Sequence, residues 1–377
     1  MSPPTIRCDI FCAVVDNFGD VGVCWRLARL LATEFGWEVR LLIDDSSALA
    51  WLAPDHAQTS VGIGSFHATA YSDAEVVIEA FACEIPEAYQ AAMAERSAAP
   101  VWINLEYLSA EQWVTESHGL TSIHPRSGLT KHFFFPGFDA KTGGLIRERD
   151  YDQRRGGFDA AMFRARHGLP NAAPGELLVS LFFYPNAPLA ELYAAWSASP
   201  VPIVAIVPGS PAPPSINGNL RVLPLPLLSQ LDYDELLWLC DLNFVRGEDS
   251  FVRAQWAGKP LVWQIYPQQD DAHLVKLDSF LSRYSPVGAD ETNANAETTM
   301  QQGGRAKDAL SAVACDNTPL RNLMMTWNGQ GDPDWSAVAA QFPQLNFHAK
   351  QWAINLRQHP DLATNLRDFC LTRLKLG

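Results

Sequence analysis

The chain has 377 residues, of which 47% are hydrophobic and 19% charged, and its net charge is -14 at neutral pH. This length suffices for two domains with separate cores, and the composition excludes a disordered or fibrous protein. The acidic excess disfavours nonspecific binding to nucleic acid or to anionic membranes, so neither partner is expected.

The cysteines and the N-terminus indicate the cellular compartment. Seven scattered cysteines form no CxxC pair, which predicts reduced thiols and gives no zinc pattern. No run approaches the roughly 18 apolar residues of a spanning helix, and no basic segment followed by a cleavable hydrophobic one precedes the first strand. We therefore expect a cytoplasmic protein.

The first half of the chain alternates strands and helices. Residues 7–15 read as a buried strand, 22–35 as an amphipathic helix and 37–43 as a second strand, which together make a right-handed parallel βαβ unit. Two further strands are predicted at 76–79 and 101–104, and Leu105-Glu106-Tyr107 closes the second of them.

The turn after the first strand reads DNFGDVG and carries two carboxylates, Asp16 and Asp20. Its glycine spacing does not match a dinucleotide or Walker loop. Two carboxylates at this edge of a sheet suit a cationic partner, and one of them could accept a proton from it. Two other interpretations stay open: Asp20 caps the helix while Asp16 bonds the loop backbone, or both share Mg²⁺.

The second half of the chain repeats the α/β pattern. An interdomain connection is expected between residues 130 and 175, with the linker proper at 151–175, and an Asn-, Thr- and Gln-rich loop is expected at 289–306. The predicted strands of this half lie at 176–184, 202–207, 220–223, 239–245 and 261–266.

Two successive α/β halves predict a GT-B glycosyltransferase fold, in which two Rossmann-like domains face a central cleft. The domains are expected at 1–150, which would bind the acceptor, and at 176–351, which would bind the nucleotide sugar. The segment 347–376 is helical by pattern. By analogy with such folds, a last helix at about 352–377 should pack back on the first domain.

The segment NFVRGEDSFVRAQWAGKP places three charged residues in the turn between a buried strand and a helix. Arg246 ends the strand, Gly247 permits a sharp turn, and Asp249 or Ser250 can cap the helix. The helix N-terminus and the guanidinium would together suit a diphosphate. A purely structural turn is the alternative, although a cap alone does not require so many charges.

These two motifs together resemble the EarP family, the arginine rhamnosyltransferases of elongation factor P. The resemblance rests on FCAVVDNFGDVGVCWRLARLLA and on DYDELLWLCDLNFVRGEDSFVRAQWAGKPLVWQIYPQQDDAH, and it covers essentially the whole chain. It implies transfer of L-rhamnose from dTDP-β-L-rhamnose to an arginine of elongation factor P, with inversion and without a metal or other cofactor.

The resemblance also implies which residues act. The catalytic carboxylates of the family fall on Asp16, Asp20 and Glu248. Its donor-binding positions fall on Phe182, Tyr184, Gln230, Tyr233, Arg246, Asp249 and Ser250. Phe183 lies between Phe182 and Tyr184, so the family's two aromatic positions match this segment in more than one way. Tyr233 stands where some relatives have Phe.

A guanidinium is protonated and its nitrogen is a poor nucleophile, so carboxylates must activate it. We expect Asp20 to act as the general base and Asp16 to bind the guanidinium, while the sequence leaves the role of Glu248 open. Two other functions remain possible from the residues alone: a GT-B transferase with a small-molecule, lipid or glycan acceptor, and a nucleotide-sugar-binding module without turnover.

Overall fold

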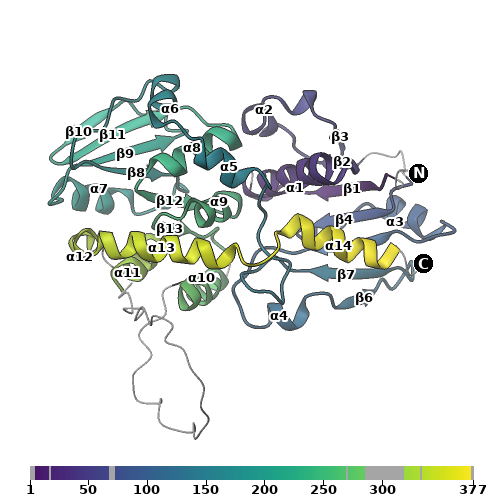
Figure 1. Ribbon diagram of the computed structural model, residues 1–377. Helices are drawn as coiled ribbons and strands as arrows, with labels where there is room; N and C mark the ends of the chain where they lie inside the picture. Colours follow the sequence, from purple (N-terminus) through teal and green to yellow (C-terminus); the bar gives the residue numbers. More distant parts are fainter. Residues whose placement is uncertain are drawn as a thin grey trace, which may run out of the picture.

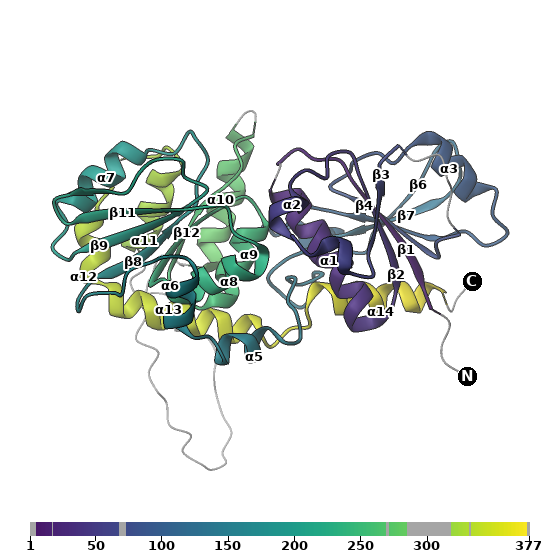
Figure 2. The ribbon, with the colours of Figure 1, turned by 90° about the horizontal axis from the view of Figure 1, so that it is seen from above.

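The computed structural model describes residues 5–16, 18–67, 73–268, 271–284, 318–331 and 333–374. The strands in these ranges form two sheets, one in each half of the chain, which lie side by side (Figures 1 and 2). The loop predicted at 289–306 lies outside the described residues.

The first sheet has the order β3-β2-β1-β4-β5-β7-β6 and is parallel except at β6. Its strands are β1 (Arg7–Cys12), β2 (Glu38–Ile43), β3 (Gly62–Ser65), β4 (Val76–Ala80), β5 (Val101–Leu105), β6 (Thr121–Ile123) and β7 (Thr130–Phe134). The helical segments of this half are α1 (Gly19–Phe35), α2 (Leu49–Leu52), the 3-10 turn η1 (His56–Gln58), α3 (Glu87–Ala94) and α4 (Val114–Ser117).

The second sheet has the order β10-β11-β9-β8-β12-β13 and is parallel except at β10. Its strands are β8 (Leu177–Leu181), β9 (Ile203–Pro208), β10 (Ser215–Asn217), β11 (Leu220–Leu225), β12 (Leu242–Arg246) and β13 (Leu261–Gln264). Its helices are α7 (Leu189–Ser197), α8 (Gln230–Leu239), α9 (Asp249–Ala257), α10 (Ala272–Tyr284), α11 (Thr318–Trp327), α12 (Trp335–Ala340) and α13 (Phe342–Leu356).

The strand orders explain where a site forms. Each sheet runs outward in both directions from its first strand, so the order reverses between β1 and β4 and between β8 and β12. Loops at the carboxyl ends of strands diverge at such a point and leave a crevice for a ligand. The DNFGD loop follows β1 and the RGEDS turn follows β12, so both motifs lie at these crevices.

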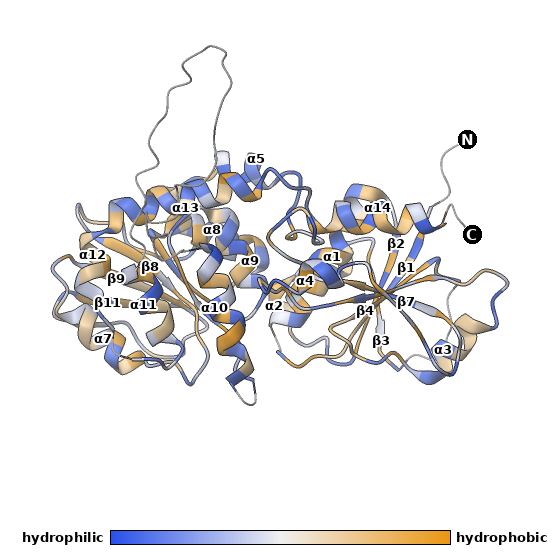
Figure 3. Ribbon diagram, turned by 90° about the horizontal axis from the view of Figure 1, so that it is seen from below, coloured by the Kyte–Doolittle hydropathy of each residue, from blue (hydrophilic) through white to orange (hydrophobic). Residues whose placement is uncertain are grey.

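The cores lie between the sheets and their helices. All residues of β4, β5 and β9 are buried, as expected for parallel strands covered on both faces. In Figure 3 the strands are mainly apolar, whereas the helices carry both polar and apolar residues. Within the described ranges, no helix is both long and apolar enough to cross a bilayer.

The segment between the sheets and the C-terminal helices connect the two halves. The short helices α5 (Tyr151–Gly156) and α6 (Ala160–Arg166) lie between the last strand of the first sheet and β8. At the other end of the chain, α13 packs on α9, whereas α14 (Leu362–Leu374) packs on α1 and β5 of the first half (Figure 1). On this basis we propose domains 1–150 and 176–351, with residues 151–175 between them.

Several predicted boundaries are wrong. The first strand ends at Cys12 and not at residue 15, and the strand predicted at 176–184 ends at Leu181. The first long helix begins at Gly19, so Asp20 lies inside its first turn. The strand predicted from residue 239 begins at Leu242, because Leu239 is the last residue of α8. The single helix predicted for 347–376 is two helices, interrupted at Pro360, which cannot donate a helical hydrogen bond.

Candidate active site

Asp20 is held at the carboxyl end of the first sheet and is 1% exposed. One carboxylate oxygen accepts the backbone N–H groups of Val15 and Asp16, both at 2.9 Å, and the nearby Tyr107 side chain favours the ionised form of Asp20. Burial raises the pKa of Asp20 to about 6 despite these hydrogen bonds. The carboxylate is therefore mostly ionised at neutral pH, with a pKa that suits a general base.

Asp16 follows β1 and contacts the second half of the molecule. Its Oδ2 accepts the O–H of Tyr184 at 2.5 Å. Burial raises the pKa of Asp16, although this bond and the Arg246 charge act in the opposite direction. The Asp16–Tyr184 hydrogen bond therefore joins the loop after β1 to the loop after β8.

Gly247 brings the RGEDS turn against Asp16. Its φ of +60° is in the left-handed region that favours glycine. A Cβ at this position would overlap the Asp16 carboxylate and lie 2.6 Å from the Tyr184 hydroxyl oxygen. Only a glycine fits both the backbone conformation and the close approach.

Glu248 is the N-cap residue of α9, but its side chain makes no capping bond. Instead, Oε2 accepts the backbone N–H of Leu108, in the first half, at 3.0 Å. Burial raises the pKa of Glu248 to about 8, and the nearby Asp20 charge contributes in the same direction. The prediction that Asp249 or Ser250 caps this helix is wrong, because neither side chain makes that bond.

Arg246 is enclosed by aromatic rings at the end of β12. Its Cζ lies 4.2 Å from the ring centroid of Phe182, 4.6 Å from that of Tyr184 and 4.9 Å from that of Phe18. Nη1 donates to the Phe183 carbonyl oxygen at 2.7 Å, whereas the buried Nε finds no partner among the described residues. A buried cation with a free donor suits an anionic ligand.

Ser250 bonds to the backbone of Arg246, and Tyr233 packs near the Phe182 ring. The Ser250 hydroxyl donates to the Arg246 carbonyl oxygen at 2.5 Å and accepts the Arg246 backbone N–H at 3.0 Å. The buried Tyr233 ring lies 5.6 Å from that of Phe182. Ser250 therefore shapes the turn, and the aromatic side chains supply flat surfaces beside the cation.

Two cavities meet at Asp16, which lines both. The space open to a water molecule is about 50 Å³ in the first and about 330 Å³ in the second, and the second lies within the range of small-molecule sites. The residues predicted to bind the donor that line the first cavity are Phe182, Gln230, Tyr233, Arg246, Asp249 and Ser250. Residues that line the second cavity include Asp20, Phe81, Tyr107, Leu108, Glu248, Trp263, Tyr266 and Lys276.

The two cavities differ in the charged residues that line them. Arg246 and Asp249 line the first cavity, whereas Asp20, Glu248 and Lys276 line the second. Tyr184, predicted to bind the donor, lines neither cavity and instead bonds to Asp16 between them. The structure thus brings all ten predicted residues to one region, in two groups.

Asp249 lines the first cavity, yet its carboxylate is already paired. Oδ1 accepts from Arg26 Nε at 2.9 Å and Oδ2 from Arg26 Nη2 at 3.3 Å. Gln230 Nε2 donates to the same carboxylate at 3.1 Å and to the Gly22 carbonyl oxygen at 2.9 Å. Both side chains therefore link α1 of the first half to α8 and α9 of the second.

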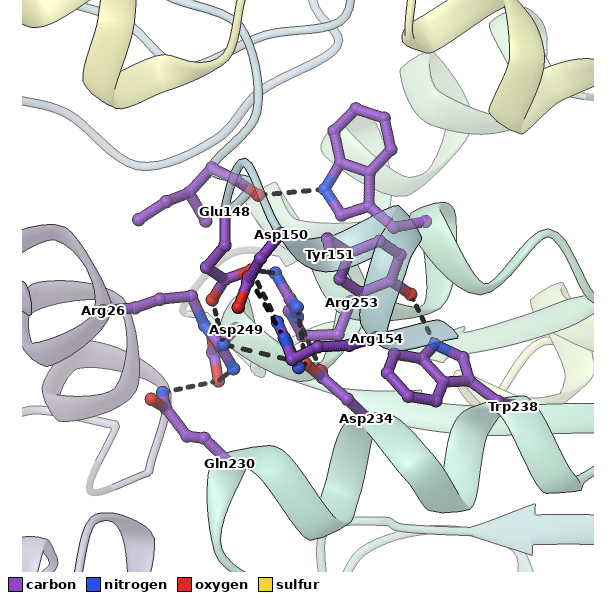
Figure 4. A network of polar contacts seen from close by, with 12 residues as sticks. Arg26, Glu148, Asp150, Tyr151, Arg154, Gln230, Asp234, Trp238, Asp249 and Arg253 are labelled. Atoms are coloured by element: carbon purple, nitrogen blue, oxygen red, sulfur yellow. Dashed lines mark hydrogen bonds and ion pairs between the residues drawn. The ribbon is translucent and has the colours of Figure 1, made fainter. Parts of the chain in front are cut away.

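The Arg26–Asp249 pair belongs to a buried cluster of charges between the halves (Figure 4). Glu148 accepts from Arg26 at 2.7 Å and lies 2.8 Å from Arg253, which is also bound by both oxygens of Asp234 at 2.6 and 2.7 Å. Burial alone would raise the pKa of Glu148, but Arg253 and Arg26 hold it well below its ordinary value. The cluster is therefore ionised and paired.

Three residues of this region were missed by sequence reasoning. Arg26 is seven positions into an ordinary amphipathic helix, and nothing local marks it as an interdomain contact. Phe81 and Tyr107 directly follow β4 and β5. Their position after the carboxyl ends of two parallel strands could have marked them as residues of the site. Among the described residues, no cluster of three or more His, Cys, Asp or Glu side chains has a metal-site arrangement.

Comparisons with known proteins point to one family. Residues 8–371 match the model of the elongation factor P (EF-P) rhamnosyltransferase EarP. The protein-arginine rhamnosyltransferase of Pseudomonas putida is 41% identical, over 96% of this chain and 97% of its own, and that of Neisseria meningitidis is 38% identical, over 89% and 94%.

Solved structures agree in fold. A structure described as the basis for EarP-mediated arginine glycosylation of translation elongation factor EF-P is 31% identical, with a TM-score of 0.63 over 96% of this chain and 98% of its own. The spinosyn rhamnosyltransferase SpnG complexed with thymidine diphosphate is 11% identical, with a TM-score of 0.53 over 97% and 99%. The fold is therefore GT-B, as predicted.

Proposed function

We propose, because the chain belongs to the EarP family of elongation factor P rhamnosyltransferases, that it transfers L-rhamnose from dTDP-β-L-rhamnose to an arginine side chain of elongation factor P. The observation that supports this most is the pair of cavities that meet at Asp16. One provides a cation for a diphosphate, and the other provides carboxylates for a guanidinium.

The first cavity would hold the donor. Arg246 and the N-terminus of α9 would bind the diphosphate and stabilise the leaving dTDP, with the free Nε as one donor. The rings of Phe182 and Tyr233 offer surfaces for thymine or deoxyribose. Because these groups already supply positive charge at the phosphates, we propose that the reaction needs no metal.

The second cavity would hold the acceptor arginine. An arginine nitrogen attacks the anomeric carbon, the bond from that carbon to the diphosphate oxygen breaks, and the nitrogen gives its proton to Asp20. Attack from the face opposite dTDP inverts the anomeric carbon. Asp16, which lines both cavities, would bind the guanidinium beside the sugar. Glu248, with a pKa of about 8, would orient it from the second half.

Intact-mass analysis after incubation with dTDP-β-L-rhamnose and elongation factor P tests the proposal. The expected result is the gain of one deoxyhexose on the acceptor, mapped to arginine by fragmentation, with an α linkage by NMR. Absence of this adduct, or its attachment to another residue type, would refute the proposed acceptor. A β linkage would refute inversion alone.

The donor site gives a prediction about metal removal. Calorimetric binding of dTDP should be unchanged by EDTA, whereas Arg246→Ala should weaken it by about 2 kcal/mol, roughly 30-fold, through loss of a charge-assisted contact. Loss of dTDP binding in EDTA alone would contradict the metal-free site. Unchanged binding by Arg246→Ala would remove Arg246 from the diphosphate site.

A further inference from the structure

An aromatic pair that the proposed mechanism does not use forms one wall of the second cavity. Phe81 follows β4 and Tyr107 follows β5, and these are neighbouring parallel strands. The two rings are stacked, with centroids 4.2 Å apart and planes inclined by 11°. Both rings line the cavity that contains Asp20 and Glu248.

The backbone that carries Phe81 has an unusual conformation. Phe81, Ala82 and Glu84 have φ values of 58°, 53° and 50°, in a region that residues with a Cβ seldom adopt. The Phe81 N–H donates to the Leu105 carbonyl oxygen at 2.7 Å, and the Glu84 N–H donates to the buried Glu79 carboxylate at 3.1 Å. Such strain persists where the surroundings enforce it, and it is concentrated at functional sites.

The pair also adjoins both carboxylates. The Tyr107 side chain interacts with Asp20, and the next residue, Leu108, donates its backbone N–H to Glu248. The Lys276 ammonium lies 5.8 Å from the centroid of the Tyr107 ring, so that ring already has a cation within the distance of a cation–π contact. Flat rings and carboxylates in one cavity are complementary to a flat cation.

We propose that Phe81 and Tyr107 form a platform on which the acceptor guanidinium stacks, and that this platform makes the site select arginine over lysine. This inference rests on the proposed function. A guanidinium is planar and weakly hydrated, so it can lie against a ring while its edges bond to Asp20 and Glu248. A lysine ammonium is compact and strongly hydrated, so it cannot lie flat against the ring and bond to both carboxylates at once. Phe81 therefore acts on specificity, and Tyr107 additionally positions the Asp20 carboxylate.

Phe81→Gly tests the platform, because glycine removes the ring and adopts the same positive φ readily. We expect the KM for elongation factor P to rise about 10-fold while the Kd for dTDP stays unchanged. Phe81→Trp retains a ring and should keep the acceptor KM within about twofold. Relative activity toward an acceptor with lysine at the modified position should rise in Phe81→Gly.

Ala82→Gly is the matched control, since it relieves the neighbouring positive φ without removing a ring. If Phe81→Gly changes the acceptor KM no more than Ala82→Gly does, the platform is refuted. A wild-type enzyme that modifies no arginine refutes the proposed function and the platform with it. If the wild-type enzyme modifies arginine and the Phe81→Gly variant has the same acceptor KM as the wild type, only the platform is refuted.

Discussion

At the scale of single residues, burial gives two carboxylates of the second cavity different pKa values. Asp20 and Glu248 line the same cavity, yet burial raises their pKa values to about 6 and about 8. At pH 7, Asp20 is mostly ionised and Glu248 mostly protonated. Different pKa values in one site indicate different chemical roles, and Asp20 is the one ready to accept a proton.

Replacing Asp20, the proposed base, should abolish most of the transfer activity. Asp20→Asn removes the proton acceptor while keeping the size of the side chain, so we expect single-turnover transfer to fall about 100-fold or more. Asp44→Asn is the control, since Asp44 is an exposed carboxylate near the same edge of the first sheet. Transfer by Asp20→Asn at a rate close to that of the control would show that another group takes the proton.

The pKa of Asp20 also predicts the pH dependence. Only the ionised carboxylate can accept a proton, so kcat/KM for the acceptor should rise tenfold per pH unit below about 6 and level off above it. The Asp16 charge raises the pKa of Asp20, so Asp16→Asn should move this limb to lower pH. A pH profile without a limb near 6 in the wild type would contradict the assignment.

At the scale of elements, two helices carry the two motifs to one place. The DNFGD loop leads into α1 and the RGEDS turn leads into α9, and these helices contact each other across the cleft. A Cβ on Gly22 of α1 would lie 3.1 Å from the Asp249 Cβ, so the helices approach closely there. Their N-terminal loops therefore meet at Asp16 and Gly247.

A methyl group at Gly247 should disrupt this meeting. Gly247→Ala strains a positive φ at a cost of about 1–2 kcal/mol and also displaces the Asp16 carboxylate, so activity should be lost. Gly168→Ala, at φ +65° with open space around it, should lower unfolding stability by a similar amount and leave activity intact. Equal activities of the two variants in a transfer assay would refute the steric argument.

At the scale of the whole molecule, the halves are joined by buried ion pairs and by side chains of the site itself. Arg26 pairs with Asp249 and Glu148 pairs with Arg253 between the halves, and Glu248 and Tyr184 bond to the first half directly. Because Asp249 and Gln230 line the first cavity and belong to these contacts, the geometry of the donor cavity depends on how the halves are packed.

Breaking the central pair should destabilise the whole protein. Arg26→Ala leaves Asp249 without its buried cation, so we expect a loss of about 3–5 kcal/mol in unfolding free energy by chemical denaturation. Arg126→Ala, in the exposed Arg126–Glu87 pair, should cost at most about 1 kcal/mol. A loss in Arg26→Ala no greater than in Arg126→Ala would mean that the cluster does not hold the halves together.

The sequence by itself determined the fold class and the strand ends that carry chemistry. Apolar strands that alternate with amphipathic helices specify parallel sheets, and charged residues directly after a buried strand must lie at its carboxyl edge. The placement of Asp16, Asp20, Arg246 and Glu248 beside cavities could therefore be anticipated from local pattern. The start of α1 could not, because Gly19 and Gly22 are poor helix formers by propensity, whereas the Asp20 N–H bonds to the Asp16 carbonyl oxygen and begins the helix there.

Only the tertiary structure decided which partners these side chains contact. The sequence predicts that Asp249 caps a helix or binds the sugar donor. In the structure its carboxylate instead accepts a hydrogen bond from Arg26, 223 positions away in the chain. Phe81 and Tyr107 look like ordinary residues after strands until the pairing of β4 with β5 stacks their rings. Sequence fixes local conformation through neighbours a few residues apart, whereas pairing, burial and pKa depend on which distant segments the fold brings into contact.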